Sequence, residues 1–265
     1  MTPRTEAAVL CGGEGEAGGT LPWFPRRVKA PLESNNLSLL RSIIRLISCH
    51  GIDTITLLAG LSSGEVEGYF GDGSDLGVRL KYFKDASGTC GNLNALSLAL
   101  RKGVIPRCDE LLICYGDLFC DVDIMELLMA HRKSAADATL VLARGYALPV
   151  GVAEVGRGGR VLAVQEKPRL ELSVITGFMV AGDRTLDLAR ERASAKMTDL
   201  MAHLLPELLR SGGRLLGYFT DKAWYGRDTR ATLEKLDSEL PHPRIRVPAG
   251  ERVLPGRVTV SLRAT

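Results

Sequence analysis

Short apolar segments alternate with amphipathic ones along the first half of this 265-residue chain. Apolar residues 7–10 are followed by a stretch, 37–50, whose apolar residues recur at helical spacing, and then by apolar residues 55–58. Strands separated by a helix pair in parallel, because the helix carries the chain back to the start of the next strand. The pattern therefore predicts an α/β fold: a Rossmann-like, mostly parallel sheet between two layers of helices.

The alternation continues to about residue 143 and then changes. Residues 149–180 read as short strands with glycine turns, which predicts a small β-rich insertion. We expect one domain over residues 1–240, with its β-rich part at 149–182, and a tail over 241–265 that contains four prolines. Further strands are expected at 78–83, 111–114, 138–143 and 215–219, and helices at 64–70, 93–102, about 121–131, 185–209 and 229–240.

Composition limits the partners and the compartment. Thirty-four basic residues against thirty-one acidic ones leave a net charge of only +3, which argues against a nucleic acid or an anionic membrane as partner. No long apolar stretch or signal-peptide core is evident, so the expectation is a cytoplasmic protein with no membrane contact. The six cysteines form no CxxC pair and mostly lie in apolar segments, which predicts buried free thiols.

The strand at 7–10 runs into the glycine-rich segment Cys11-Gly12-Gly13-Glu14-Gly15, and an isolated Lys29 follows. Glycines allow a tight loop that points several N–H groups at one anion, and a lysine adds a positive charge for phosphate. An ordinary flexible loop explains the glycines equally well. The segment alone therefore leaves phosphate binding open.

Two further segments follow strands that should end at the same edge of the sheet. These are residues 87–92 and Tyr115-Gly116-Asp117. Ligands of open parallel sheets bind at the carboxyl ends of the strands, so Asp117 could hold Mg²⁺ there, although a turn or cap role is the alternative. Asp121 and Asp123 resemble the metal motif of nucleotide-sugar glycosyltransferases, but both immediately precede a helix, which favours capping.

In this order, the segments resemble the sugar-1-phosphate nucleotidyltransferases, also called nucleoside-diphosphate-sugar pyrophosphorylases, over about residues 7–237. Tyr115-Gly116-Asp117, and Asp228 four positions after Trp224, are most similar to the glucose-1-phosphate cytidylyltransferases. The matching segments are Leu10 to Gly15 with Lys29, Gly51-Ile52-Asp53, Tyr69 to Gly73, Gly88-Thr89-Cys90-Gly91, Gly116-Asp117, Gly151-Val152, Glu166-Lys167-Pro168, Gly177-Phe178, and Trp224 with Asp228-Thr229.

The resemblance implies a fold of the nucleotide-diphospho-sugar transferase type and a Mg²⁺-dependent attack of a sugar-1-phosphate on the α-phosphate of a nucleoside triphosphate, CTP being favoured. It also implies a catalytic domain over 1–240, an acceptor-binding part at 149–182, and a homo-oligomer as one possible assembly. By this resemblance, Lys29 and Asp117 are catalytic; Asp117 and Asp228 bind the metal; Leu10, Gly12, Gly13, Gly15, Gly88, Thr89 and Gly116 bind the nucleotide; and Gly151, Glu166, Lys167 and Gly177 bind the sugar phosphate.

The glycine segment departs from the family in one respect. The family has an arginine that helps to hold the triphosphate, whereas residues 12–22 of this chain contain none and add Glu14 and Glu16. Two alternatives therefore stay open beside the transferase. One is a non-catalytic homologue that binds nucleotide or sugar phosphate as a regulatory subunit, and the other is a nucleotide-sugar glycosyltransferase that uses Asp121 and Asp123.

Overall fold

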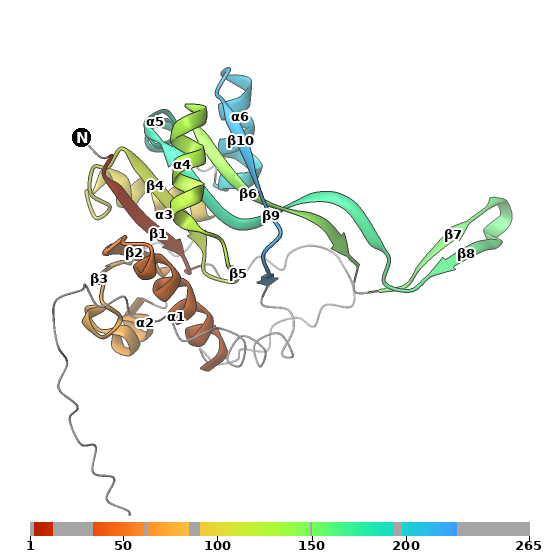
Figure 1. The fold of residues 1–265 in the computed structure, drawn as a ribbon, viewed down its shortest axis with the longest axis horizontal. Coiled ribbons are helices and arrows are strands. Elements are labelled where there is room, and N and C mark those ends of the chain that lie inside the picture. Colours follow the sequence, from red (N-terminus) through yellow and green to blue (C-terminus); the bar gives the residue numbers. More distant parts are fainter. Residues whose placement is uncertain are drawn as a thin grey trace, which may run out of the picture.

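The central sheet of the protein combines strands from almost the whole length of the chain (Figure 1). The computed structural model describes residues 3–12, 34–60, 63–84, 91–148, 150–192 and 198–226. Within these residues, seven strands form one sheet in the order β10-β6-β9-β4-β1-β2-β3. They are β1 (Thr5–Leu10), β2 (Thr54–Leu58), β3 (Arg79–Phe83), β4 (Glu110–Tyr115), β6 (Ala138–Ala147), β9 (Arg169–Gly182) and β10 (Leu215–Thr220).

The sheet is mostly parallel, as the alternating pattern predicts. β1 pairs in parallel with β2 and β4, β2 with β3, and β6 with β10. The strand β9 differs, because it runs antiparallel to both of its neighbours, β4 and β6. The chain reaches β9 from the β-rich insertion rather than through a crossover helix, so no helix reverses its direction.

Helices cover both faces of the sheet, and successive residues of each strand face opposite layers. In β1, Ala7 and Val9 pack into a core with α1, α2 and α4, whereas Ala8 packs on the other side with α3, α5 and α6. The two cores make the sheet fully buried on both faces, which explains its continuous apolar strands. The helices are α1 (Ser34–Cys49), α2 (Ser63–Phe70), α3 (Gly91–Arg101), α4 (Ile124–Ser134), α5 (Asp183–Arg192) and α6 (Leu205–Arg210).

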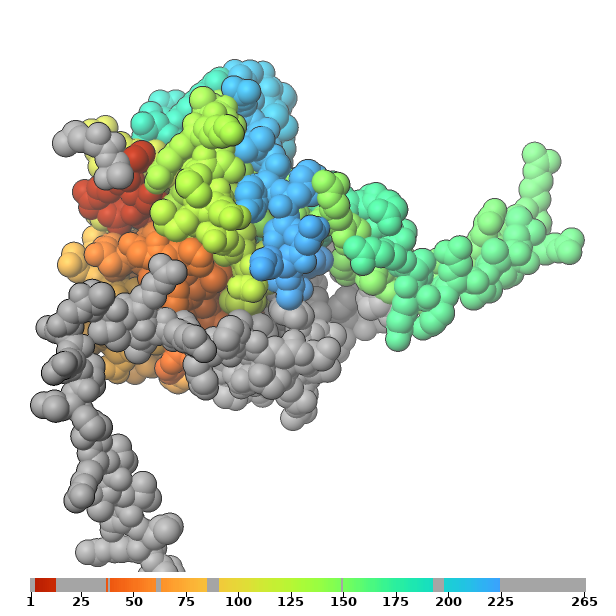
Figure 2. All heavy atoms as spheres, in the orientation of Figure 1, coloured from red at the N-terminus to blue at the C-terminus, as the bar shows by residue number. Residues whose placement is uncertain are grey.

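A two-stranded hairpin, β7 (Val152–Val155) and β8 (Val161–Gln165), projects from the body (Figures 1 and 2). We call residues 148–168, which carry it, the arm. Its side chains are largely exposed; Val164 of β8, for example, retains 71% of its accessible surface. The predicted β-rich insertion is therefore present, and β9 continues from the end of the arm into the central sheet.

Two expectations from the sequence are wrong in detail. The single helix expected over residues 185–209 is interrupted, because Thr198 and Asp199 are not helical and a π-helical turn, Leu200–Leu204, precedes α6. Of the cysteines expected to be buried, Cys49 is exposed and Cys11 half-buried, while Cys108, Cys114 and Cys120 are buried; all five are free thiols. Outside the described residues lie Cys90, the helix expected at 229–240 and the tail 241–265. No helix among the described residues is long and apolar enough to span a membrane.

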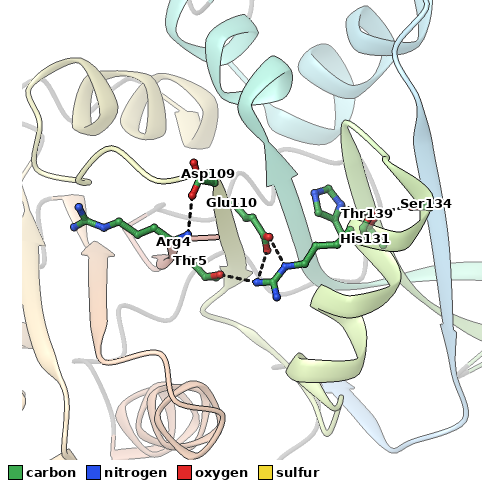
Figure 3. Close-up of polar contacts among 8 residues, drawn as sticks. Arg4, Thr5, Asp109, Glu110, His131, Ser134 and Thr139 are labelled. Carbon is green, nitrogen blue, oxygen red and sulfur yellow. Dashed lines mark hydrogen bonds and ion pairs between the residues drawn. The ribbon is translucent and has the colours of Figure 1, made fainter. Parts of the chain in front are cut away.

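Polar side chains cluster at the amino ends of β1 and β4 (Figure 3). Arg132 of α4 donates from Nε and Nη2 to the two carboxylate oxygens of Glu110, at 2.5 and 3.2 Å, and from Nη2 to Thr5 Oγ1 at 3.2 Å. Nearby, the buried His131 shares a 2.8 Å hydrogen bond with Thr139. These contacts tie α4 to three strands, β1, β4 and β6.

Candidate active site

The carboxyl ends of β1 and β4 form the centre of the candidate site. Leu10 and Tyr115, the last residues of the two strands, are register partners, and the Gly116 N–H donates to the Leu10 carbonyl at 2.9 Å. The chain leaves β1 toward the layer of α1 and enters β4 from the layer of α3, so the crossovers lie on opposite faces. This is the topological switch point at which open α/β sheets bind their ligands.

Gly12 begins the predicted phosphate loop in a position without room for a side chain. A Cβ at Gly12 would lie 2.7 Å from the Leu58 carbonyl oxygen and would collide with the backbone N–H of Gly60. The preceding Cys11 N–H donates to the same carbonyl at 3.1 Å. Glycine at this position therefore lets the chain leave β1 closely packed against the end of β2.

Asp117 follows β4 directly and carries an exposed side chain. It forms no hydrogen bond or ion pair with any other described residue. Mg²⁺ is commonly bound by one or two carboxylates together with substrate phosphates, so a free carboxylate at the switch point fits such an ion.

A second small sheet brings a distant part of the chain next to Asp117. The strand β5 (Leu118–Cys120) begins one residue after Asp117 and pairs antiparallel with β11 (Trp224–Gly226), with Gly226 opposite Leu118. Gly226 is two residues before Asp228 in the sequence. The chain therefore approaches the neighbourhood of Asp117 at the point where the described residues end.

A polar bridge that the sequence analysis missed joins α3, β4 and the π-helical turn. Asn92 Nδ2 donates to Asp199 Oδ2 at 2.7 Å and to the Tyr115 hydroxyl at 3.4 Å, and Asn92 Oδ1 accepts from the Leu200 N–H at 2.7 Å. The second oxygen of Asp199 caps the turn by accepting from the Ala202 N–H at 2.7 Å. Asn92 and Asp199 are 107 positions apart, and only the capping preference of Asp199 could have drawn attention to it.

Burial controls the proton chemistry of two side chains at this edge. It raises the pKa of Cys11 to about 12, so the thiol stays protonated and is no nucleophile. Burial also raises the pKa of Tyr115 well above its usual range, and the negative charges of Asp199 and Asp117 add to the effect. The neutral forms of Cys11 and Tyr115 are therefore favoured at this edge of the sheet.

The predicted sugar-phosphate residues lie mainly at the base of the arm. Glu166 and Lys167 connect β8 to β9, are both exposed, and form an ion pair of 3.9 Å. A Cβ at Gly151 would lie 2.9 Å from Glu166 Oε2, so these two predicted residues are neighbours. Lys167 adopts a left-handed backbone conformation with φ of 46°, which costs a non-glycine residue about 1 kcal/mol or more and is commonest at functional sites.

Gly177 connects the arm side of the site to the Asp117 side. It lies inside β9 with φ of +85°, and a Cβ there would lie 2.7 Å from Leu118 Cβ. A side chain would strain the backbone and push away the start of β5. Gly177 therefore lies within β9, at the irregularity in its pairing with β6, and not in a turn between strands.

The described residues bring together Leu10, Gly12, Gly116 and Asp117 at the switch point, and Gly151, Glu166 and Lys167 at the arm. Asp123, a candidate ligand of the glycosyltransferase alternative, caps α4 by accepting from the Glu126 N–H at 2.9 Å. Six predicted site residues lie outside the described residues: Gly13, Gly15, Lys29, Gly88, Thr89 and Asp228.

Known proteins are similar to this chain in sequence and in fold. The chain is 26% identical to the mannose-1-phosphate guanylyltransferase of Mycobacterium tuberculosis, over 98% of its own length and 72% of the relative's. It is also 26% identical to a UTP–glucose-1-phosphate uridylyltransferase of Synechocystis, over 70% of its own length and 51% of the relative's. A solved structure, a putative glucose-1-phosphate thymidylyltransferase from Bacillus anthracis, has the same fold, with a TM-score of 0.62 at 18% identity over 88% of this chain and 94% of that one.

The relatives differ in the nucleotide that their names specify, but they share the sequence pattern of one family. The model of that family, described as nucleotidyl transferase, matches residues 9–229, which include the glycine segment, Asp117, both strands of the arm and Asp228. The chain therefore belongs to the nucleotidyl transferase family.

Proposed function

We propose that the protein is a sugar-1-phosphate nucleotidyltransferase. A phosphate oxygen of the sugar-1-phosphate attacks the α-phosphorus of a nucleoside triphosphate, the bond from that phosphorus to the bridging oxygen breaks, and pyrophosphate leaves with the electron pair. Such a transfer depends on holding two anions together and neutralising the charge at the α-phosphate. The observation that carries the proposal is the Asp117 carboxylate at the switch point, which is exposed and has no partner among the described residues, beside the strand that precedes Asp228 in the sequence.

The nucleotide would bind at the carboxyl end of β1. The backbone from Leu10 to Gly15 would hold the phosphates together with Lys29, and Gly88, Thr89 and Gly116 would border the nucleoside. Asp117 and Asp228 would hold Mg²⁺, which when bound neutralises negative charge on the phosphates. The close packing of Gly12 against Gly60 supports this role, because it holds the end of β1 against the end of β2 at the switch point.

The acceptor would bind where the arm meets the sheet. Glu166 can accept hydrogen bonds from sugar hydroxyls, and Lys167 can meet the phosphate, with Gly151 and Gly177 leaving space. The strained conformation of Lys167 supports a binding role, because such conformations cluster at functional sites and the residue is exposed. Gly177 places this side of the site against Leu118, one residue from Asp117.

Pyrophosphate release tests the proposal directly. The protein is incubated with Mg²⁺, each of the four nucleoside triphosphates and a panel of sugar-1-phosphates, and we expect release only when all three components are present. The resemblance to the glucose-1-phosphate cytidylyltransferases favours CTP, whereas the named relatives are guanylyl-, uridylyl- and thymidylyltransferases. Release with GTP, UTP or dTTP instead of CTP would support the proposed reaction but contradict CTP as the nucleotide.

One sequence feature favours a second candidate, a homologue that binds ligands without turnover. The segment 12–22 lacks the arginine that the family resemblance leads one to expect, and Glu14 and Glu16 add negative charge there. Measurable binding of a triphosphate or sugar phosphate, with no pyrophosphate from any pair of substrates, would establish this candidate in place of the enzyme.

A further inference from the structure

The polar bridge at the end of β4 contains one hydrogen-bond donor that no described residue accepts. Asn92 Nδ2 donates to the Tyr115 hydroxyl oxygen at 3.4 Å. The hydroxyl's own proton goes to no acceptor among the described residues. Since Tyr115 is half-buried and ends its strand at the switch point, this proton is available to a bound ligand.

The direction of each hydrogen bond in the bridge is determined by its partners. Asn92 Oδ1 faces a backbone N–H, that of Leu200, and Asn92 Nδ2 faces the carboxylate of Asp199. If the amide were reversed, its NH₂ group would face the Leu200 N–H, donor against donor, and its oxygen would face the Asp199 carboxylate, acceptor against acceptor. Only one orientation therefore satisfies both contacts. The Tyr115 oxygen therefore accepts from Asn92 and keeps its proton for another partner.

The surroundings of Tyr115 indicate which part of a substrate this proton would meet. The Asn92 amide that contacts the hydroxyl is also bound to the Asp199 carboxylate at 2.7 Å, so a negative charge that the proposed metal does not neutralise lies close to the hydroxyl. Phosphate oxygens would be repelled there, whereas a base or a ribose carries no charge. Tyr115 is also the register partner of Leu10 of β1, on one side of β4. The predicted sugar-phosphate residues lie on the other side of β4, where β9 pairs with it and continues from β8.

We propose that Tyr115 is a specificity-determining residue that donates its hydroxyl proton to an uncharged acceptor atom of the nucleoside, and that Asn92 and Asp199 are positioning residues that hold the hydroxyl in place. The inference rests on the proposed function, because it takes the nucleoside triphosphate as the ligand of the switch point. It adds a polar contact from a side chain to a site whose other nucleotide residues would act largely through their backbone.

The first test compares Tyr115→Phe with the parent protein. Binding of each nucleoside triphosphate is measured by titration calorimetry with Mg²⁺ present, and the KM values are taken from pyrophosphate release. We expect the preferred triphosphate to bind roughly three- to tenfold more weakly, the usual effect of one lost hydrogen bond, with the KM for the sugar-1-phosphate unchanged. Tyr218→Phe is the matched control, because Tyr218 lies on the distant strand β10, its hydroxyl donates to Glu126 of α4, and its loss should leave nucleotide binding unaffected.

Nucleotide analogues locate the acceptor atom. Triphosphates that lack the 2′- or the 3′-hydroxyl bind equally to the parent and to Tyr115→Phe if the missing ribose oxygen is the acceptor. If Tyr115→Phe loses affinity only for triphosphates with the preferred base, and still loses it with both deoxy analogues, the acceptor is on the base. Equal binding of all triphosphates by Tyr115→Phe and the parent would overturn the inference.

The second test exchanges the amide and the carboxylate of the bridge. In the double variant Asn92→Asp with Asp199→Asn, the amide at position 199 donates to the carboxylate at position 92. The Leu200 N–H still donates to an oxygen at position 92, which is now a carboxylate oxygen. The Tyr115 hydroxyl then faces a carboxylate and gives its proton to it. We expect Asn92→Asp alone to lower the melting temperature, the double variant to recover it, and nucleotide binding in the double variant to remain as weak as in Tyr115→Phe.

The outcomes separate this inference from the proposed function. A parent protein that binds triphosphates but releases no pyrophosphate contradicts the proposed function, while the dissociation constants still decide on Tyr115. A parent that binds no triphosphate contradicts both. A double variant that is as stable as the parent and binds nucleotide equally well would show that the direction of the bridge is irrelevant, and the positioning role would fall.

Discussion

The two ends of the paired strands β1 and β4 differ in how their polar groups are used. At the amino end, Thr5 is the register partner of Glu110, and the Glu110 carboxylate is held by Arg132 through two hydrogen bonds. At the carboxyl end, Leu10 is the register partner of Tyr115, and the carboxylate of Asp117 that follows has no partner among the described residues. The Glu110 charge is therefore paired within the protein, whereas the Asp117 charge is unpaired among the described residues and is the one we propose for a ligand.

The difference shows how one pair of strands can serve both stability and function. The buried Glu110 at the amino end needs Arg132, because an unpaired buried carboxylate is costly. At the carboxyl end, Asp117 stays in water and costs the fold little. We therefore expect substitutions at the amino end to change the free energy of unfolding, and substitutions at the carboxyl end to change activity.

Asp117→Asn should give the largest effect. The substitution keeps the shape of an exposed side chain but removes the charge that would hold the metal, so kcat/KM for pyrophosphate release should fall on the order of 10²- to 10³-fold. The melting temperature should not change. Full activity of the variant would contradict the metal-binding role of Asp117. It would also contradict the functional role that we assign to the carboxyl end of β1 and β4.

Arg132→Met should destabilise the protein and leave the site intact. The substitution leaves the buried Glu110 without its ion pair, and we expect a loss of about 2–3 kcal/mol in the free energy of unfolding, at the low end for a buried pair because Arg132 is partly exposed. Urea unfolding measures it. Arg210→Met, which breaks an exposed pair on α6, is the control and should change stability by less than about 0.5 kcal/mol. A large loss of kcat/KM in the folded Arg132→Met protein would contradict the separation of the two ends.

Gly12→Ala tests whether close packing is also required at the carboxyl end. The added Cβ would collide with the backbone of Gly60, so the ends of β1 and β2 must shift, at a cost of about 1–3 kcal/mol in stability together with weaker nucleotide binding. Gly68→Ala in α2, where no atom lies within 4 Å of the new Cβ, provides the control and should be neutral or slightly stabilising. Equal stability of the two variants in urea unfolding would show that the Gly12 contact relaxes freely.

His131 should make stability at the amino end sensitive to pH, with the smallest effect. Burial lowers the pKa of His131 from its ordinary value of 6.5 in the folded protein. The unfolded chain then binds a proton below about pH 6.5 that the folded protein does not, so the free energy of unfolding falls as the pH falls through this range and levels off below the folded pKa. The free energy of unfolding of His131→Gln should depend less on pH over the same range, and an unchanged slope would exclude this histidine as the source.

The sequence predicts the parts of the fold that depend on local periodicity. The strands at 7–10, 55–58 and 111–114 lie within β1, β2 and β4, because continuous apolar runs are typical of strands buried on both faces. The antiparallel direction of β9 and the break before Asp199 could not be predicted, since neither follows from the spacing of apolar residues. The site shows the same limit: Asp117 follows a strand and is visible in the sequence, whereas the contact between Asn92 and Asp199 depends on how two distant segments pack.

The ladder between β6 and β9 has a consequence for how the protein could be re-engineered. Ala147 and Arg169 are register partners, and the Leu148 N–H donates to the Pro168 carbonyl at 3.0 Å, so the arm leaves and rejoins the sheet at one place. We therefore expect that a relative's hairpin could replace the arm, because the two ends of the inserted segment would still meet. Recombination at this junction would test whether the arm determines acceptor preference, as we propose, while leaving β1 and β4 unaltered.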